Sequence, residues 1–148
     1  MIKEKRINSD PRKKLPGLIK KLKQIDSIVA FYLHGSYVSN NILPLSDIDF
    51  AVLFDLHLTG KENFELYLKV NSVITMALGT EEFDLINMNT YPSRFSHNVL
   101  KEGKLLFCND RGHLVDFIEK NNMQYLDFKF YRSSFDKEFL NSLGVHDE

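Results

Sequence analysis

The stretch His34-Gly35-Ser36, separated by ten residues from Asp47-Ile48-Asp49, decides the fold of this chain. Residues 27–33 precede it, and residues 47–54 begin with its two aspartates. Both runs are rich in β-branched and aromatic side chains and predict buried strands. Aspartates at positions i and i+2 of a strand share one face, about 6.6 Å apart along it. Two such carboxylates repel each other unless a cation lies between them.

The residue types in this stretch suit a phosphate and a metal ion. Gly35 has no side chain, so a ligand can approach its backbone closely. A helix opening at Gly35-Ser36 would offer free N–H groups to a phosphate, and the Ser36 hydroxyl adds a donor. Mg²⁺ takes carboxylate and phosphate oxygens. The pattern therefore predicts metal-assisted phosphoryl or nucleotidyl transfer, with Asp47 and Asp49 as metal ligands.

A two-metal site needs a third carboxylate, and Asp84 is the candidate. Residues 83–88 predict a short strand in which the Asp84 side chain faces away from those of Phe83 and Leu85. We expect a charge inside such an apolar run to be buried for a functional reason. Glu81 and Glu82 are alternatives, but they precede the strand and suggest solvated loop residues.

The rest of the chain alternates between helical and strand periods, which predicts one α/β (α+β) domain over residues 1–148, a small mixed sheet flanked by helices. Ser9-Asp10-Pro11 predicts the start of a first helix, and Gly79 predicts the end of another. The final segment predicts a long amphipathic helix with an aromatic stripe, with a break near Asn121-Asn122 as an alternative. Helices are expected at 11–25, 61–78, 92–102 and 112–143, and a further strand at 104–108.

Composition and charge exclude several classes of protein. The chain has 148 residues, 43% of them apolar and 26% charged, as in ordinary globular domains rather than disordered ones. The single cysteine, Cys108, excludes an internal disulfide. The absence of a long apolar run or a signal peptide leads us to expect a cytoplasmic protein without membrane contact. A basic segment at residues 1–23 precedes an acidic remainder, and the overall pI of about 6.5 argues against a duplex-DNA binder.

In this order along the chain, these residues resemble the signature of the minimal nucleotidyltransferases of the polymerase-β-like superfamily. There, a Gly-Ser precedes an Asp-x-Asp, and a third Asp lies on a later strand. Gly35, Ser36, Asp47, Asp49 and Asp84 match this signature. The resemblance covers a catalytic core of about 15–108, followed by a helical segment of about 112–143, and it implies the nucleotidyltransferase fold. Within the superfamily, the chain is most similar to the MNT antitoxins encoded beside HEPN-domain toxins.

The resemblance also implies an activity and residue roles. Such antitoxins transfer AMP from ATP to a tyrosine of the toxin, an RNase, and release pyrophosphate. By this resemblance Gly35 and Ser36 hold the triphosphate, and Asp47 and Asp49 ligate two Mg²⁺ ions. Asp84 ligates the catalytic metal and helps to activate the attacking hydroxyl. Many relatives place an arginine just after the Gly-Ser, whereas residues 37–41 contain no cation here.

Two other functions remain open from the sequence. One is nucleotidyl transfer to a small molecule such as an aminoglycoside, and the other is a non-catalytic antitoxin that neutralises its partner by contact. The aromatic stripe of the last helix suits packing against the sheet or docking of a partner, with Phe117 inward and the Phe135–Phe139 end outward. We expect His97 and His113 to be isolated structural residues and Cys108 to be a buried thiol.

Overall fold

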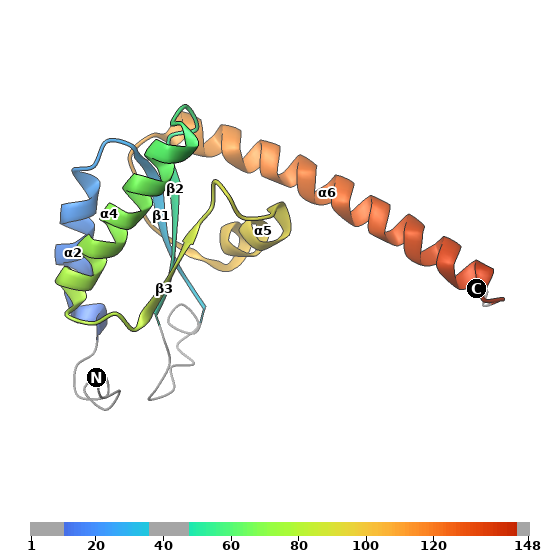
Figure 1. Cartoon of the computed structure of the whole chain (residues 1–148), viewed down its shortest axis with the longest axis horizontal. Coiled ribbons are helices and arrows are strands. Elements are labelled where there is room, and N and C mark those ends of the chain that lie inside the picture. The colour runs from blue at the N-terminus through green and yellow to red at the C-terminus, as the bar shows by residue number, and fades with distance from the viewer. Residues whose placement is uncertain (1–10, 36–47, 145–148) are drawn as a thin grey trace.

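The protein forms a four-stranded sheet with helices on both faces (Figure 1). Its computed structural model describes residues 11–35 and 48–144. Within them, the elements are η1 (Pro11–Lys14), α2 (Leu15–Lys23), β1 (Ile28–His34), β2 (Ile48–Phe54), α4 (Gly60–Leu78), β3 (Phe83–Asn87), α5 (Ser93–Glu102), β4 (Lys104–Cys108) and α6 (Arg111–Ser142). The predicted mixed α/β architecture is confirmed.

The order of the strands in the sheet is β3-β2-β1-β4. β1 pairs antiparallel with both β2 and β4, whereas β2 and β3 are parallel and are joined by the α4 crossover. This arrangement places the end of β1 and the beginnings of β2 and β3 at one edge of the sheet. The residues that the sequence singles out lie at that edge.

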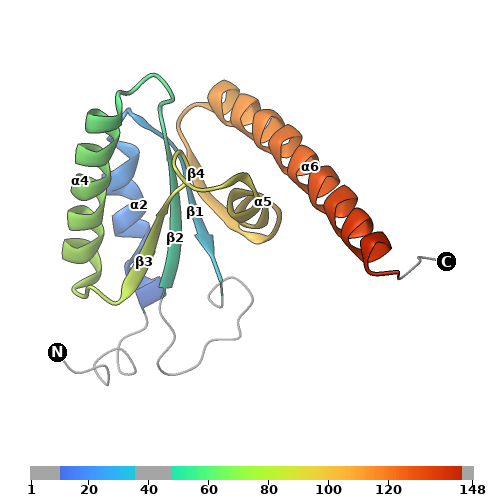
Figure 2. The ribbon, with the colours of Figure 1, turned by 45° about the vertical axis from the view of Figure 1, so that its right-hand side comes forward.

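Helices cover both faces of the sheet, so the central strands are apolar on both sides. Six of the seven residues of β1 are buried, a continuous run that is typical of a strand covered on two faces. One face packs against α2 and α4 around Phe31, Phe50 and Phe54. The other packs against α5 and the start of α6 around Tyr32 and Leu53. Figure 2 shows the two helical layers on opposite sides of the strands.

Local signals in the sequence fix the ends of α4. The Thr59 hydroxyl accepts a hydrogen bond from the Glu62 backbone N–H at 3.1 Å, and the Glu62 carboxylate accepts one from the Thr59 N–H at 2.9 Å. This reciprocal capping box satisfies two free donors of the first turn. Gly79 ends the helix with φ 70°, the left-handed conformation that glycine adopts without cost, so its predicted role is confirmed.

The first helix is shorter than the predicted range 11–25. A 3-10 turn at Pro11–Lys14 leads into α2, and Lys14 precedes that helix without a side-chain cap. Pro16 lies in the first turn of α2, where its missing N–H costs nothing. The predicted cap at Ser9-Asp10 lies outside the described residues.

The last helix, α6, is continuous, so the alternative of a break near Asn121 is wrong. Asn121 is buried, and its Nδ2 donates to the Ser93 carbonyl oxygen at 3.2 Å, which joins α6 to the start of α5. His97 of α5 stacks on Tyr125 of α6 with 3.9 Å between ring centroids, which confirms its structural role. Asn121 therefore makes a helix–helix contact instead of ending the helix.

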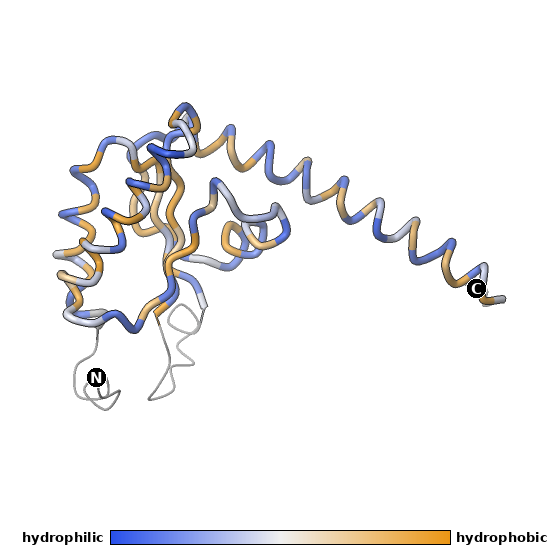
Figure 3. The backbone as a smooth tube through the Cα atoms, viewed as in Figure 1, coloured by the Kyte–Doolittle hydropathy of each residue, from blue (hydrophilic) through white to orange (hydrophobic). Residues whose placement is uncertain are grey.

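Beyond this contact α6 extends away from the sheet (Figure 1), and its side chains are almost all exposed. Met123, Leu126 and Phe130 share one side of the helix, at steps of three and four residues, whereas Phe135 and Phe139 lie on another. Figure 3 shows apolar positions recurring along the whole length. The single amphipathic stripe expected from the sequence is thus wrong for this half. No helix among the described residues has the length and apolar content that crossing a bilayer requires.

The capping box gives a test of local stability. We expect Thr59→Ala to lower the free energy of unfolding by about 1 kcal/mol, because the first turn loses a side-chain acceptor. Urea denaturation measures the difference. Ser72→Ala, at an exposed position of the same helix, is the matched control and should not destabilise the protein. Equal losses in the two variants would contradict the role of the cap.

The pH dependence of this cap follows from the pKa of Glu62. Hydrogen bonds from Thr59, chiefly from its backbone N–H, lower the pKa of that carboxyl in the folded state. The stabilisation is therefore present above the ordinary pKa of glutamate and is lost as the pH falls through the lowered folded value. Glu62→Gln should reduce the acid sensitivity of the free energy of unfolding, measured between about pH 6 and about pH 3.

Candidate active site

Three of the predicted site residues, Gly35, Asp49 and Asp84, lie at one edge of the sheet. Asp49 of β2 pairs in register with His34 of β1 and with Asp84 of β3. Directly paired residues on neighbouring strands project from the same face of a sheet. This row therefore lies on the face that α5 and α6 cover further along, and Gly35 follows it directly at the end of β1.

Gly35 is in contact with the Asp49 carboxylate. Its φ is 78°, in the left-handed region, and a Cβ added there would collide with Asp49 Oδ2. Glycine is therefore required for two reasons: the backbone has a positive φ, and a carboxylate lies where a side chain would be. The sequence predicted that a ligand can approach the Gly35 backbone closely. In the structure, the Asp49 carboxylate lies close to this backbone.

The two described carboxylates differ in exposure. Asp49 is half-buried, whereas Asp84 is exposed. Asp84 does face away from Phe83 and Leu85, both of which pack into the core on the α2 and α4 side, as predicted. The expectation that its charge is buried is wrong, because the Asp84 side chain is exposed to solvent. The Asp84 carboxylate needs no partner to offset desolvation.

Tyr67 of α4 supports β3 next to Asp84 and was missed by the sequence reasoning. Its hydroxyl donates to the Leu85 carbonyl oxygen at 2.8 Å, and burial raises the pKa of the phenol, so it stays a donor at neutral pH. The signal was a tyrosine among the apolar positions of a core-facing helix. Such a tyrosine needs a partner for its hydroxyl.

Part of the predicted site lies outside the described residues. Ser36, Asp47 and the cation-free stretch 37–41 all fall there. Across residues 11–35 and 48–144, no three His, Cys, Asp or Glu side chains gather to hold a metal ion. Asp49 and Asp84 nevertheless offer the hard oxygen ligands that Mg²⁺ prefers, beside a glycine that keeps the space free of a side chain. The donor set fits this metal. Glu81 and Glu82 precede β3, as expected, but only Glu81 is exposed, whereas Glu82 is half-buried.

His34 is half-buried, and its Nε2 is buried without a hydrogen-bond partner among the described residues. His34 lies next to Asp49, at the β1 end of the row that continues to Asp84. Cys108 is half-buried with a free thiol, so the expectation of a fully buried thiol is only partly met.

Small pockets also lie at the opposite edge of the sheet, where β2 and β3 end. Two of them have volumes of about 250 and 220 Å³ and share Asn63 and Thr90 in their walls. Their amides already serve the architecture: Asn63 Oδ1 accepts from Asn87 Nδ2, and Asn89 bonds both the N–H and the carbonyl of Phe54. We assign no chemistry to these pockets.

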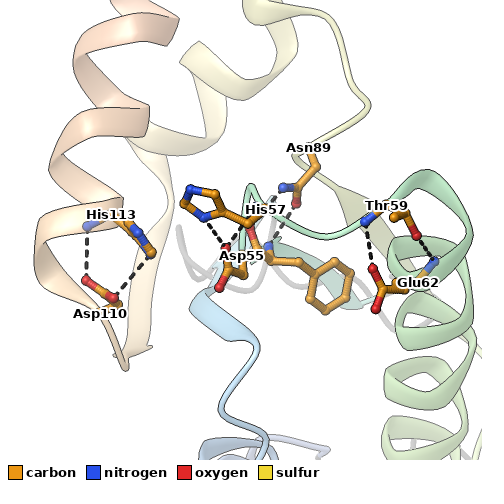
Figure 4. Close-up of polar contacts among 8 residues, drawn as sticks. Asp55, His57, Thr59, Glu62, Asn89, Asp110 and His113 are labelled. Atoms are coloured by element: carbon orange, nitrogen blue, oxygen red, sulfur yellow. Dashed lines mark hydrogen bonds and ion pairs between the residues drawn. The ribbon is translucent and has the colours of Figure 1, made fainter.

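A second polar cluster lies near that opposite edge (Figure 4). His57 Nδ1 is 3.0 Å from Asp55 Oδ1, and His113 Nδ1 is 3.1 Å from Asp110 Oδ2. The two imidazole rings are 5.8 Å apart between centroids. Hydrogen bonds from His57, first of all from its backbone N–H, lower the pKa of Asp55. The prediction that His113 is isolated is therefore wrong, because folding brings it beside a histidine 56 positions earlier.

Comparison with known proteins agrees with this geometry. The family described as "Polymerase beta, Nucleotidyltransferase" matches residues 17–112. The protein adenylyltransferase MntA of Aphanizomenon flos-aquae (strain 2012/KM1/D3) is 31% identical over 96 residues, which cover 58% of this chain and 61% of that protein. The chain thus spans less than two thirds of the length of this curated relative.

Solved structures of toxin–antitoxin complexes share the fold. A chain of a toxin–antitoxin crystal structure with AMP-PNP superposes with a TM-score of 0.63 and 22% identity, over 89% of this chain and 99% of that chain. A chain from the complex of tri-AMPylated Shewanella oneidensis HEPN toxin with MNT antitoxin superposes with a TM-score of 0.58 and 22% identity, over 88% and 96%. At this identity the likeness concerns the fold.

Substitution of Gly35 tests the contact with Asp49. We expect Gly35→Ala to abolish binding of Mg²⁺ with a non-hydrolysable ATP analogue, because the new Cβ would displace the Asp49 carboxylate. Isothermal titration calorimetry measures the binding. Gly17→Ala is the matched control: Gly17 lies in α2 with nothing within 4 Å of an added Cβ, so binding should be unchanged. Wild-type binding by Gly35→Ala would remove Gly35 and Asp49 from the site.

Proposed function

Because the chain belongs to the polymerase beta nucleotidyltransferase family, we propose that it is a Mg²⁺-dependent protein adenylyltransferase of a toxin–antitoxin system. It transfers AMP from ATP to a tyrosine of a cognate HEPN-type toxin in the cytoplasm and thereby silences it. The observation that carries the proposal is the row of Asp49 and Asp84 on one face of the sheet. It lies beside Gly35, a position where any side chain would collide with the Asp49 carboxylate.

Each residue of the edge has a role in this proposal. Asp49 and Asp84 would hold Mg²⁺ together with Asp47, and the Gly35 backbone and the Ser36 hydroxyl would bind the triphosphate. Mg²⁺ supplies charge neutralisation on the phosphates when it is bound. The exposed Asp84 carboxylate would accept the proton of the attacking tyrosine hydroxyl as its oxygen bonds to the α-phosphorus. The bond from that phosphorus to the bridging oxygen breaks, and pyrophosphate leaves.

The comparisons support AMP as the group transferred and a protein as its acceptor. The curated relative is named a protein adenylyltransferase, and structures that share the fold contain AMP-PNP or an AMPylated HEPN toxin. The exposed Asp84 agrees with an acceptor that is too large to enter a closed cavity.

The decisive assay is intact-mass spectrometry of the purified toxin after incubation with this protein, ATP and Mg²⁺. We expect a mass gain of one or more AMP groups, abolished in Asp49→Asn and in Asp84→Asn because each variant loses a metal ligand. Glu81→Gln is the matched control, an exposed carboxylate at the same edge that precedes β3. Transfer by both aspartate variants at the wild-type rate would refute the site.

A non-catalytic antitoxin is the second candidate, and the exposed apolar half of α6 favours it. Phe130, Phe135 and Phe139 are 68%, 67% and 53% exposed, which is unusual for phenylalanine in a protein that acts without a partner. Contact alone could then neutralise the toxin. Transfer to a small molecule such as an aminoglycoside is the remaining alternative, and AMP transfer to that drug without any partner protein would support it.

Neutralisation separates catalysis from contact. We expect the double variant Asp49→Asn/Asp84→Asn to bind the toxin in size-exclusion chromatography yet to leave its RNase activity intact, because complex formation alone does not modify the toxin. An RNA cleavage assay provides the measurement. Full inhibition by this variant would instead establish the contact-only antitoxin. Glu81→Gln should inhibit like the wild type in either case.

A further inference from the structure

Two histidines that are distant in the sequence face each other at the edge of the sheet opposite the active site. His57 belongs to the loop between β2 and α4, and His113 to the first turn of α6. Figure 4 shows each ring beside the aspartate that it contacts. The ring centroids are 5.8 Å apart, and the ring planes are inclined by 45°. Neither residue takes part in the proposed transfer reaction, since Asp49 and Asp55 lie at opposite ends of β2, about 20 Å apart.

The separation of the rings fits one shared metal ion. Zinc–imidazole bonds are about 2.0–2.1 Å long, so two imidazoles on one tetrahedral zinc have ring centroids about 5 Å apart. The observed 5.8 Å is within about 1 Å of this value, and the His57 side chain is 82% exposed. His113 is the more rigid partner, with its side chain 33% exposed.

The aspartates orient both rings in the way that metal sites require. Asp55 Oδ1 lies 3.0 Å from His57 Nδ1, and Asp110 Oδ2 lies 3.1 Å from His113 Nδ1. A carboxylate on one ring nitrogen fixes the tautomer and leaves the other nitrogen, Nε2, as the metal ligand. Both carboxylates are themselves held in place, Asp55 by the His57 backbone N–H at 2.9 Å and Asp110 by the His113 N–H at 3.0 Å.

We propose that His57 and His113 bind one Zn²⁺ ion through their Nε2 atoms, with water in the remaining coordination positions. Two protein ligands are fewer than the three or four of catalytic and structural zinc sites, so the ion is exchangeable. Imidazole selects zinc and its neighbours in the transition series over Mg²⁺, which prefers oxygen ligands. The two metals therefore occupy opposite edges of the sheet.

The bound ion would tie the β2–α4 loop to the start of α6. The first turn of α6 is held by its Asp110 cap and by Leu114, which is buried against the sheet, whereas the distal half is exposed. A metal bridge at the first turn therefore limits the angle at which the whole helix leaves the sheet. Zinc would favour one orientation of the exposed apolar half.

Calorimetric titration of the full chain with Zn²⁺, after removal of metals by chelation, tests the site. We expect saturable binding of one equivalent in the micromolar range, unaffected by millimolar Mg²⁺. His57→Asn and His113→Asn should each weaken it more than about tenfold, and Asp55→Asn by about tenfold or more, because orientation of the ring is lost. His97→Asn is the matched control, since its ring stacks on Tyr125 away from the pair.

A Cu²⁺ probe reports the ligands directly. The electron paramagnetic resonance spectrum of the Cu²⁺-loaded chain should show coupling to two imidazole nitrogens in the wild type and to one in either histidine variant. Thermal unfolding without metal verifies that the variants are folded. Wild-type affinity in either histidine variant, or no zinc uptake in the micromolar range, would overturn the proposal. Neither result bears on AMP transfer, which Asp49 and Asp84 test separately.

Discussion

The contact between the Gly35 backbone and the Asp49 carboxylate is the constraint on which the active edge depends. β1 must end, and its chain must turn away, at the position where β2 presents its acidic side chain. A positive φ lets the chain turn, and the lack of a Cβ lets the carboxylate lie against the turn. Any other residue would separate these two strands at the edge where the proposed chemistry takes place.

That contact is held in place by the burial of β1 between two helical layers. Phe31 stacks between Phe50 and Phe107, with ring centroids 5.1 and 5.7 Å apart, so the three strands β2, β1 and β4 are joined through one aromatic row. Aromatic pairs of this kind add about 0.5–1.5 kcal/mol each beyond their buried area. The register that pairs His34 with Asp49 is thereby fixed from the interior of the sheet.

Much of this could be predicted from local sequence patterns. Apolar runs define the strands, Gly79 marks the end of α4, and alternation along β3 places Asp84 on the face opposite to Phe83. These features depend on neighbours in the chain. The exposure of Asp84 depends instead on whether another element covers its edge of the sheet, and the strand pattern carries no information about that.

Features that depend on long-range contacts were beyond sequence reasoning. Asn121 suggests a break in the helix from its sequence context alone, but in the fold its amide donates to the Ser93 carbonyl oxygen. The His57–His113 pair forms only because the loop after β2 lies beside the start of α6. The distal half of α6 was predicted to be amphipathic because its aromatic residues recur at helical steps. Apolar residues on two different sides of the helix fit the same spacing. Both sides are exposed because no element of the described chain covers them.

The direction of α4 has an electrical consequence for the edge that holds Asp49 and Asp84. This helix ends at Leu78, shortly before β3 begins, so its negative dipole end points to the same edge as the two carboxylates. Its last turn contains no basic residue, and the Lys14 ammonium reaches across from η1 to donate to the Leu78 carbonyl at 3.0 Å. That ammonium offsets the dipole of α4, whereas Asp49 and Asp84 keep two carboxylates at this edge, so the edge favours a nucleotide that arrives with its metal counter-ions over a bare polyphosphate.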